Sequence, residues 1–343
     1  MDTVGTRLAG LGTITMKKLN RKDTLRWVIG LAVAAIAIWW LARDFDWPAV
    51  LAALRQANYG WVLLGVAAIV ATAWTRTYRW QALLQPATIP FLTALNALLI
   101  GQVANLVIPL RGGDITRAML IGPERETGTA MALGTVALEK VWDLILLLLS
   151  GLLLLVVMPL PGWFTRSTWG TALTLVVGIP LLWAALHWRE TLFQWTSRLL
   201  AILPGGWDRA ILPRLRRLTD GLASIRQVDI SLRAFFWTGL TWGLGALANW
   251  AVIAAFGMYS EAAALLLLVA LMIGNSVVPT PARLGIFEGI TVVVLALFDI
   301  PPDTALAMGL VLHIVVMAPP LLMAALLALT TPLRQQKEAT HAT

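Results

Sequence analysis

The chain has 343 residues, of which 59% are hydrophobic and 13% are charged, and it contains no cysteine. Soluble domains have about half apolar and a quarter charged residues, so the composition excludes an ordinary soluble protein and predicts an all-α, polytopic membrane protein. The lack of cysteine excludes disulfides, thiolate nucleophiles and cysteine metal sites. The net charge of +8 is explained by basic loops on the inner side of a membrane, and no nucleic-acid partner is expected.

Apolar segments of membrane-spanning length follow a basic N-terminal segment. Residues 1–26 are rich in Lys and Arg, which predicts an uncleaved N-terminus in the cytoplasm. A helix needs about 20 apolar residues to cross about 30 Å of hydrocarbon. Six ranges predict full crossings: 27–42, 59–77, 129–158, 168–187, 235–258 and 303–330. The positive-inside rule places Arg76 and Arg79 in the cytoplasm after the second crossing.

Two further pairs of apolar segments are interrupted by Pro and Gly near their middle. Segments 91–110 and 112–124 contain NLVIP, and segments 261–279 and 284–299 contain NSVVP. We expect each pair to form a hairpin, 91–124 and 261–299, that is either re-entrant or crosses twice. Both arrangements keep the arginine-rich segment 188–233 and the tail 331–343 in the cytoplasm.

The charge distribution predicts an inverted repeat. Residues 27–158 form one copy and residues 168–330 the other, each with full helices and one broken hairpin. Transporters use this design, with the substrate site where the broken helices meet. The expected location is the cytoplasmic (inner) membrane, with both termini in the cytoplasm.

The segment 188–233 contains a helical apolar pattern. Eight arginines stand against four acids in this segment, and apolar residues recur at spacings of four and three: Ile211, Leu215, Leu218, Leu222 and Ile225. This pattern predicts an amphipathic helix. It lies either in the headgroup layer or against the protein's own cytoplasmic face.

The first candidate site follows Pro109 and contains Arg111, Gly113, Asp114 and Arg117. Proline removes a backbone donor and glycines permit a tight turn, so we expect a helix break and a new helix that begins near Asp114. The start of a helix beside arginines is suited to binding a phosphate. The alternative is an interfacial loop whose arginines contact lipid without specificity.

The second candidate site contains Glu139, Lys140 and Asp143 within an apolar span. The two acids are four residues apart and share a helix face, and Lys140 has the spacing to pair with Asp143. Two acids in lipid need a further cation, which Arg111 or Arg117 would supply. The group is either a structural salt-bridge network or a coupling site that carries a proton.

The third candidate site contains Arg283 and Glu288 at the break of the second hairpin. Glu288 suits the positive end of a helix, so capping is one interpretation and a binding role is the other. Asn105 and Asn275, each four residues before a proline, either repair the broken helices or contact a ligand. His313 in the last span is either a proton site or a packed, hydrogen-bonded histidine.

The three sites together resemble the transmembrane, flippase-like region of the lysylphosphatidylglycerol synthase family. The first motif, Pro-x-Arg-x-Gly-Glu-x-x-Arg, is matched by Pro109, Arg111, Gly113, Asp114 and Arg117, with Asp in place of Glu. The second, Glu-Arg-x-x-Asp, is matched by Glu139, Lys140 and Asp143, with Lys in place of Arg. The third, Pro-x-Pro-Gly-Gly-x-Gly-x-x-Glu, is matched by Pro279, Pro281, Gly285 and Glu288, but Ala282 and Arg283 replace the paired glycines.

The resemblance covers most of the chain and implies translocation of an anionic or isoprenoid-linked lipid. The loss of two glycines is expected to stiffen the third motif, and Arg283 is expected to alter the headgroup that is accepted. We find no segment with the composition of a soluble aminoacyl-transferase domain, so lysine transfer is not expected. No metal or cofactor is expected, and the expected protein partners are a second copy or a lipid-modifying enzyme.

Two alternatives to lipid transport remain open. An integral membrane enzyme acting on a lipid phosphate would use the same Arg, Glu and Asp side chains, but no nucleophile with a neighbouring base is evident. A membrane scaffold would present its arginine-rich face to partners or to anionic lipid. The scaffold predicts that Arg111→Ala and Arg283→Ala are harmless and that changes within 209–226 are not.

Overall fold

The computed structural model describes residues 45–107, 112–121, 128–201, 207–277 and 283–341. These residues form α-helices and short 3-10 turns, without a strand in any described range. The all-α prediction is therefore confirmed. The predicted segments 1–26 and 27–42 lie outside the described residues.

The first group of helices contains a short helix and two long helices that flank a hairpin. Asp46 caps α3 by accepting a hydrogen bond from the Ala49 N–H, and Asn58 caps α4 by accepting one from the Gly60 N–H. The helices are α3 (Trp47–Gln56), α4 (Tyr59–Leu83), α5 (Phe91–Val107), α6 (Gly112–Ile121) and α7 (Gly128–Val157). The start of α6 at Gly112 agrees with the predicted new helix near Asp114.

The second group repeats the order of long helix, hairpin and long helix after three connecting helices. The connecting helices are α8 (Gly162–His187), α9 (Arg189–Ala201) and α10 (Trp207–Ala223), followed by the 3-10 turn η1 (Ser224–Arg226). The group itself comprises α11 (Val228–Ala255), α12 (Glu261–Val277), α13 (Ile286–Leu295), the 3-10 turn η3 (Ala296–Phe298) and α14 (Pro302–His341).

Four of the described helices are long and apolar enough to cross a membrane, namely α4, α7, α8 and α14. The predicted span 235–258 overlaps α11, which begins at Val228, ends at Ala255, has 28 residues and is not among the four. Helices α5, α12 and α13 are apolar and shorter. The described residues thus support a multi-pass membrane protein. Of the six predicted crossings, four correspond to these helices, one overlaps α11, and the range 27–42 lies outside the described residues.

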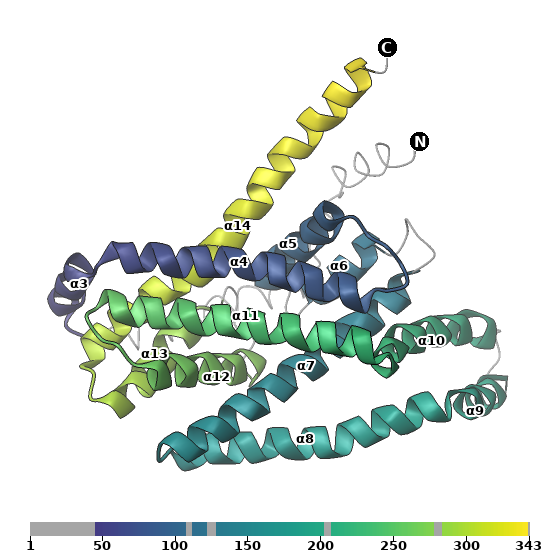
Figure 1. Ribbon diagram of the computed structural model, residues 1–343, viewed down its shortest axis with the longest axis horizontal. Helices are drawn as coiled ribbons and strands as arrows, with labels where there is room; N and C mark the ends of the chain where they lie inside the picture. Colours follow the sequence, from purple (N-terminus) through teal and green to yellow (C-terminus); the bar gives the residue numbers. More distant parts are fainter. Residues whose placement is uncertain (1–44, 108–111, 122–127, 202–206, 278–282, 342–343) are drawn as a thin grey trace, which may run out of the picture. The chain divides into compact units, whose positions relative to one another are not determined.

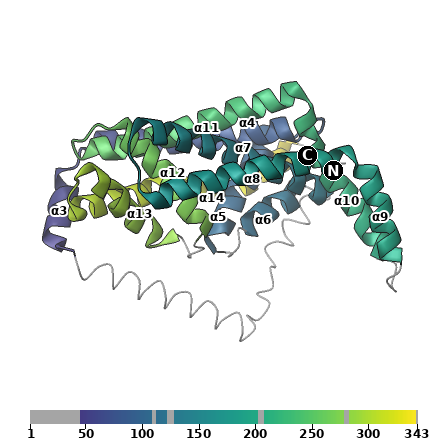
Figure 2. The same cartoon turned by 90° about the horizontal axis from the view of Figure 1, so that it is seen from below.

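The two groups of helices make matching contacts. Helices α4 and α11 run side by side in both views (Figures 1 and 2). In the first group α5 packs on α6 and α6 on α7, and in the second α12 packs on α13 and α13 on α14. The groups also exchange contacts, because α5 touches α14 and α12 touches α7. Each hairpin is therefore held by long helices of both groups.

The predicted amphipathic helix corresponds to α10, which packs against the protein. Leu222 and the following Ile225 contact the buried side chains of Leu83 and Leu138. At the crossing of α10 with α7, a side chain on Gly134 or Gly221 would collide with the backbone of the other helix. Of the two expected placements, packing on the protein's own surface is therefore the one that the structure shows.

Candidate functional site

A buried ion pair joins the first hairpin to a membrane-spanning helix. Nη2 of Arg117 on α6 lies 2.5 Å from Oε2 of Glu139 on α7. The two side chains are only 3% and 1% exposed to solvent. Arg117 is thus the cation that we predicted for Glu139, while the other candidate, Arg111, lies outside the described residues.

A second arginine, Arg79 on α4, completes the neutralisation of the two acids. Nη1 of Arg79 donates to Oδ1 of Asp143 over 2.8 Å, and Nη2 lies 3.6 Å from Oε2 of Glu139. Arg79 is 2% exposed, so its side chain is buried against other helices and does not face solvent. Helix α4 continues to Leu83, and the two acids on one face of α7 compensate the buried charge of Arg79.

Lys140 pairs with a different acid from the one predicted. Its Nζ lies 3.1 Å from Oδ2 of Asp114 on α6, and Oδ1 of Asp114 also lies 3.3 Å from Nη2 of Arg117. The expected Lys140–Asp143 pair was wrong, because Asp143 faces Arg79 on α4. Lys140 therefore connects α7 to α6 through one oxygen of the Asp114 carboxylate, while the other oxygen pairs with Arg117 within α6.

Close packing of glycines sets the position of α6. A Cβ on Gly113 would collide with the carbonyl oxygen of Gly101 on α5, so the two helices meet where neither has a side chain. Asn105 Oδ1 accepts a hydrogen bond of 2.8 Å from the Gly113 N–H, one of the N–H groups in the first turn of α6, where a helix offers no partner of its own. Asn105 thus makes a contact of the helix-repair kind, because it satisfies a backbone N–H at the start of α6.

Trp80 supports Arg117 from the side of α4. The guanidinium carbon of Arg117 lies 4.8 Å from the centre of a Trp80 ring, a favourable cation–π geometry. Trp80 is fully buried, and its Nε1 donates to Thr135 Oγ1 on α7 over 3.1 Å. Three helices therefore fix the orientation of Arg117.

Several buried polar atoms of this cluster have no hydrogen-bond partner among the described residues. They are Nε of Arg79, Nε and Nη1 of Arg117, and Oε1 of Glu139. Buried donors and acceptors are nearly always paired in folded proteins, and exceptions call for a ligand or water. The cluster therefore retains N–H donors for a further acceptor.

The second hairpin forms a separate polar pair with the last helix. Oε1 of Glu288 on α13 lies 2.7 Å from Nδ1 of His313 on α14, and the Phe287 ring stacks on the imidazole at 4.9 Å. The other oxygen, Oε2, accepts the Gly285 N–H over 2.9 Å. The structural interpretation of each residue is thus present: Glu288 caps α13, and His313 is packed and hydrogen-bonded.

In the turn before α13, Arg283 adopts the left-handed backbone conformation that usually favours glycine. Arg283 has φ 59° and Gly285 has φ 80°. Left-handed backbone is costly for residues with a Cβ, which explains why a glycine suits position 283. Pro279, Pro281 and Ala282 lie outside the described residues, as does Pro109. Oδ1 of Asn275 is buried without a partner in the described part of the chain.

The two polar groups are not joined by an ion pair within the described ranges.

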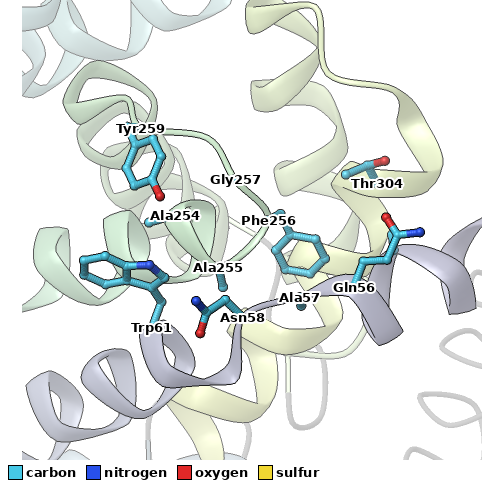
Figure 3. Close-up of a pocket in the computed structure, with 11 residues that line it drawn as sticks. Gln56, Ala57, Asn58, Trp61, Ala254, Ala255, Phe256, Gly257, Tyr259 and Thr304 are labelled. Atoms are coloured by element: carbon cyan, nitrogen blue, oxygen red, sulfur yellow. The ribbon is translucent and has the colours of Figure 1, made fainter.

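A cavity of about 450 Å³ lies apart from both polar groups, between the start of α4 and the turn that connects α11 to α12. Its lining includes Asn58, Trp61, Phe256, Tyr259 and Thr304 (Figure 3). The described residues also include no group of His, Asp and Glu with metal-ligand arrangement.

Sequence reasoning missed Arg79 and Trp80 as site residues. A signal was available, because Arg79 directly follows the apolar run of α4 and ionisable residues inside spans usually face a partner. The helix was ended at residue 77, so Arg79 was assigned to a loop. The site therefore includes Arg79 and Trp80 from α4, a helix that we had predicted only to cross the membrane.

Comparison with known proteins gives one match. The family model described as the lysylphosphatidylglycerol synthase TM region matches residues 27–324. No curated protein and no solved structure matches the chain. The matched range includes every residue of the two polar groups, from Arg79 to His313.

Proposed function

We propose that this chain, which belongs to the lysylphosphatidylglycerol synthase transmembrane family, moves an anionic lipid across the membrane. The observation that carries the proposal is the buried cluster of Arg79, Arg117, Glu139 and Asp143. Charges within membrane-spanning helices are expensive, and in membrane proteins they mark the paths of ions and polar substrates. A lipid headgroup with a phosphate is the substrate that such a path would accept.

The mechanism follows from the pairing of the cluster. Each arginine is held by a carboxylate, yet Arg117 has N–H groups that remain available to phosphate oxygens. A headgroup that moves past the cluster exchanges protein carboxylates for its own phosphate, while its acyl or isoprenoid tails stay in lipid. The charge of the headgroup is then never left unpaired inside the hydrocarbon layer.

Repeated architecture supports the same proposal. The matching contacts of α4–α7 and α11–α14 fit two related halves, each with a hairpin that touches the other half. We propose that the halves form an inverted repeat and that the hairpins approach the site from opposite faces of the cytoplasmic membrane. Broken helices in such repeats line the substrate sites of many transporters.

Reconstitution into lipid vesicles tests the proposal. Purified protein is expected to expose a fluorescent phosphatidylglycerol or a polyprenyl phosphate to a membrane-impermeant quencher faster than empty vesicles do. Glu139→Gln is expected to slow this exchange, and Glu261→Gln on the exposed first turn of α12 is the matched control. If the protein accelerates no anionic lipid, the transport proposal fails.

The same vesicles test the enzyme alternative. Lipid is extracted after incubation and analysed by mass spectrometry for new species. A product that forms with the parent protein and not with Glu139→Gln would favour a lipid-phosphate enzyme. An unchanged lipid composition during accelerated exchange would favour transport.

A further inference from the structure

One basic residue beside the buried cluster has no role in the pairing described above. Arg76 lies on α4, three residues before Arg79 and four before Trp80. Residues at these spacings share a helix face, so Arg76 lies on the face that carries Arg79 and the ring that supports Arg117. The side chain of Arg76 is partly buried.

Arg76 has no partner for its charge in the described part of the chain. Its guanidinium is within electrostatic range of Arg79, Arg117, Glu139 and Asp143, but it makes no hydrogen bond or ion pair with a described residue. Each carboxylate nearby is already used by another cation. Asp143 is bound by Arg79, Glu139 by Arg79 and Arg117, and Asp114 by Lys140 and Arg117.

The described cluster therefore has an excess of positive charge. Four basic side chains, Arg76, Arg79, Arg117 and Lys140, face three carboxylates, Asp114, Glu139 and Asp143. An uncompensated guanidinium beside apolar helices is unfavourable unless an anion neutralises it. The buried N–H groups of Arg79 and Arg117 without acceptors lie in the same cluster.

We propose that Arg76 is the residue at which this cluster binds a phosphate group. Arg79 and Arg117 are held by carboxylates and shape the site, and their remaining N–H groups complete the shell around the phosphate oxygens. Guanidinium groups suit this purpose because they offer several N–H donors in one plane to an oxyanion. The identification of the phosphate as a lipid headgroup rests on the proposed function, whereas the anion site itself does not.

The variant Arg76→Gln tests the inference on the full chain in detergent. Dioctanoyl phosphatidylglycerol is the probe, dioctanoyl phosphatidylcholine is the zwitterionic control, and inorganic phosphate is tested separately. Binding is measured by calorimetry and by the rise in unfolding temperature, since a ligand of the native state stabilises it. Arg226→Gln is the matched control, because Arg226 is exposed and has no ion pair among the described residues.

We expect the parent and Arg226→Gln to bind phosphatidylglycerol equally and Arg76→Gln to bind at least about tenfold more weakly, as for the loss of one charge-assisted contact. Arg76→Lys should retain part of the affinity. Without lipid, Arg76→Gln should unfold at the parental temperature or above, because no ion pair is lost. A lower unfolding temperature, or parental affinity in Arg76→Gln, would overturn the inference.

Two further comparisons complete the experiment. One distinguishes a lipid headgroup from free phosphate as the ligand, and the other distinguishes failure of the transport proposal from failure of the anion-site proposal. Protection by inorganic phosphate that Arg76→Gln abolishes would identify a free-phosphate site, and protection by phosphatidylglycerol alone would identify a headgroup site. If the parent binds through Arg76 but moves no lipid in vesicles, the transport proposal fails and the anion site stands. If Arg76→Gln binds and moves lipid as the parent does, only the role of Arg76 is refuted.

Discussion

Arg117 and Glu139 bring their side chains to 2.5 Å of each other from two helices, α6 and α7, with 3% and 1% exposure. The pair ties the short helix of the broken hairpin to a long membrane-spanning helix. Removing one member of a buried ion pair leaves an uncompensated charge, which costs far more than the pair contributes. The loss of stability on replacing Arg117 or Glu139 therefore measures how firmly this pair holds α6 on α7.

Glu139→Gln is expected to destabilise the protein by about 3 kcal/mol, because Arg117 and Arg79 both lose a buried carboxylate. The chain has 17 tryptophans, so unfolding in detergent can be followed by intrinsic fluorescence. Glu261→Gln, on an exposed first turn, should unfold as the parent does. Equal unfolding temperatures for Glu139→Gln and the parent would show that the pair does not hold α6 on α7.

Asp143 is expected to interact energetically with Arg79 more strongly than with Lys140. A double-mutant cycle of Arg79→Gln and Asp143→Asn should give an interaction energy of about 1 kcal/mol or more, since the groups are 2.8 Å apart and largely buried. The matched cycle of Lys140→Gln and Asp143→Asn should give less. The reverse order would restore the pairing expected from helical spacing alone.

Gly113→Ala is expected to separate α5 from α6 and to reduce both stability and lipid exchange. The added methyl group would collide with the Gly101 carbonyl oxygen and press on Asn105, and overpacking of this kind costs about 1–3 kcal/mol. Gly178→Ala on α8 meets no atom within 4 Å and is the control. Equal unfolding temperatures for the two variants would argue against the close contact.

Gly221→Ala tests whether α10 is bound to α7. A methyl group at Gly221 would collide with the Met131 carbonyl oxygen, so α10 should detach more often and trypsin should cut sooner at exposed sites such as Arg214. Gly239→Ala on α11 has open space around it and serves as the comparison. Identical cleavage rates in the two variants would place α10 away from α7.

Arg283→Gly and Arg283→Ala remove the same side chain but differ in backbone freedom. Because position 283 has φ 59°, the glycine variant should be more stable than the alanine variant by about 1 kcal/mol. Thermal unfolding of the two proteins side by side measures this difference. An alanine variant that is equally stable would show that the turn does not require a left-handed residue.

The sequence by itself determined the helical class, most helix boundaries and the places where the hairpins break. These features depend on local chemistry: the length of an apolar run, the missing N–H of proline and the freedom of glycine. The same local rules located Asp114, Arg117, Glu139, Asp143 and Glu288, because a charge inside an apolar segment is visible without any neighbour. The cap formed by Glu288 three residues after Gly285 is equally local.

Only the tertiary structure decided which charges meet. Arg79 was assigned to a loop because the positive-inside rule counts charges without knowing what packs around them. Its partner Asp143 lies 64 residues away on another helix, and Lys140 turns to Asp114 on α6 because Arg79 already lies beside Asp143. Pairing depends on the distance between helices, which is set by contacts such as that of Gly101 with Gly113 and is not written in the spacing along either helix.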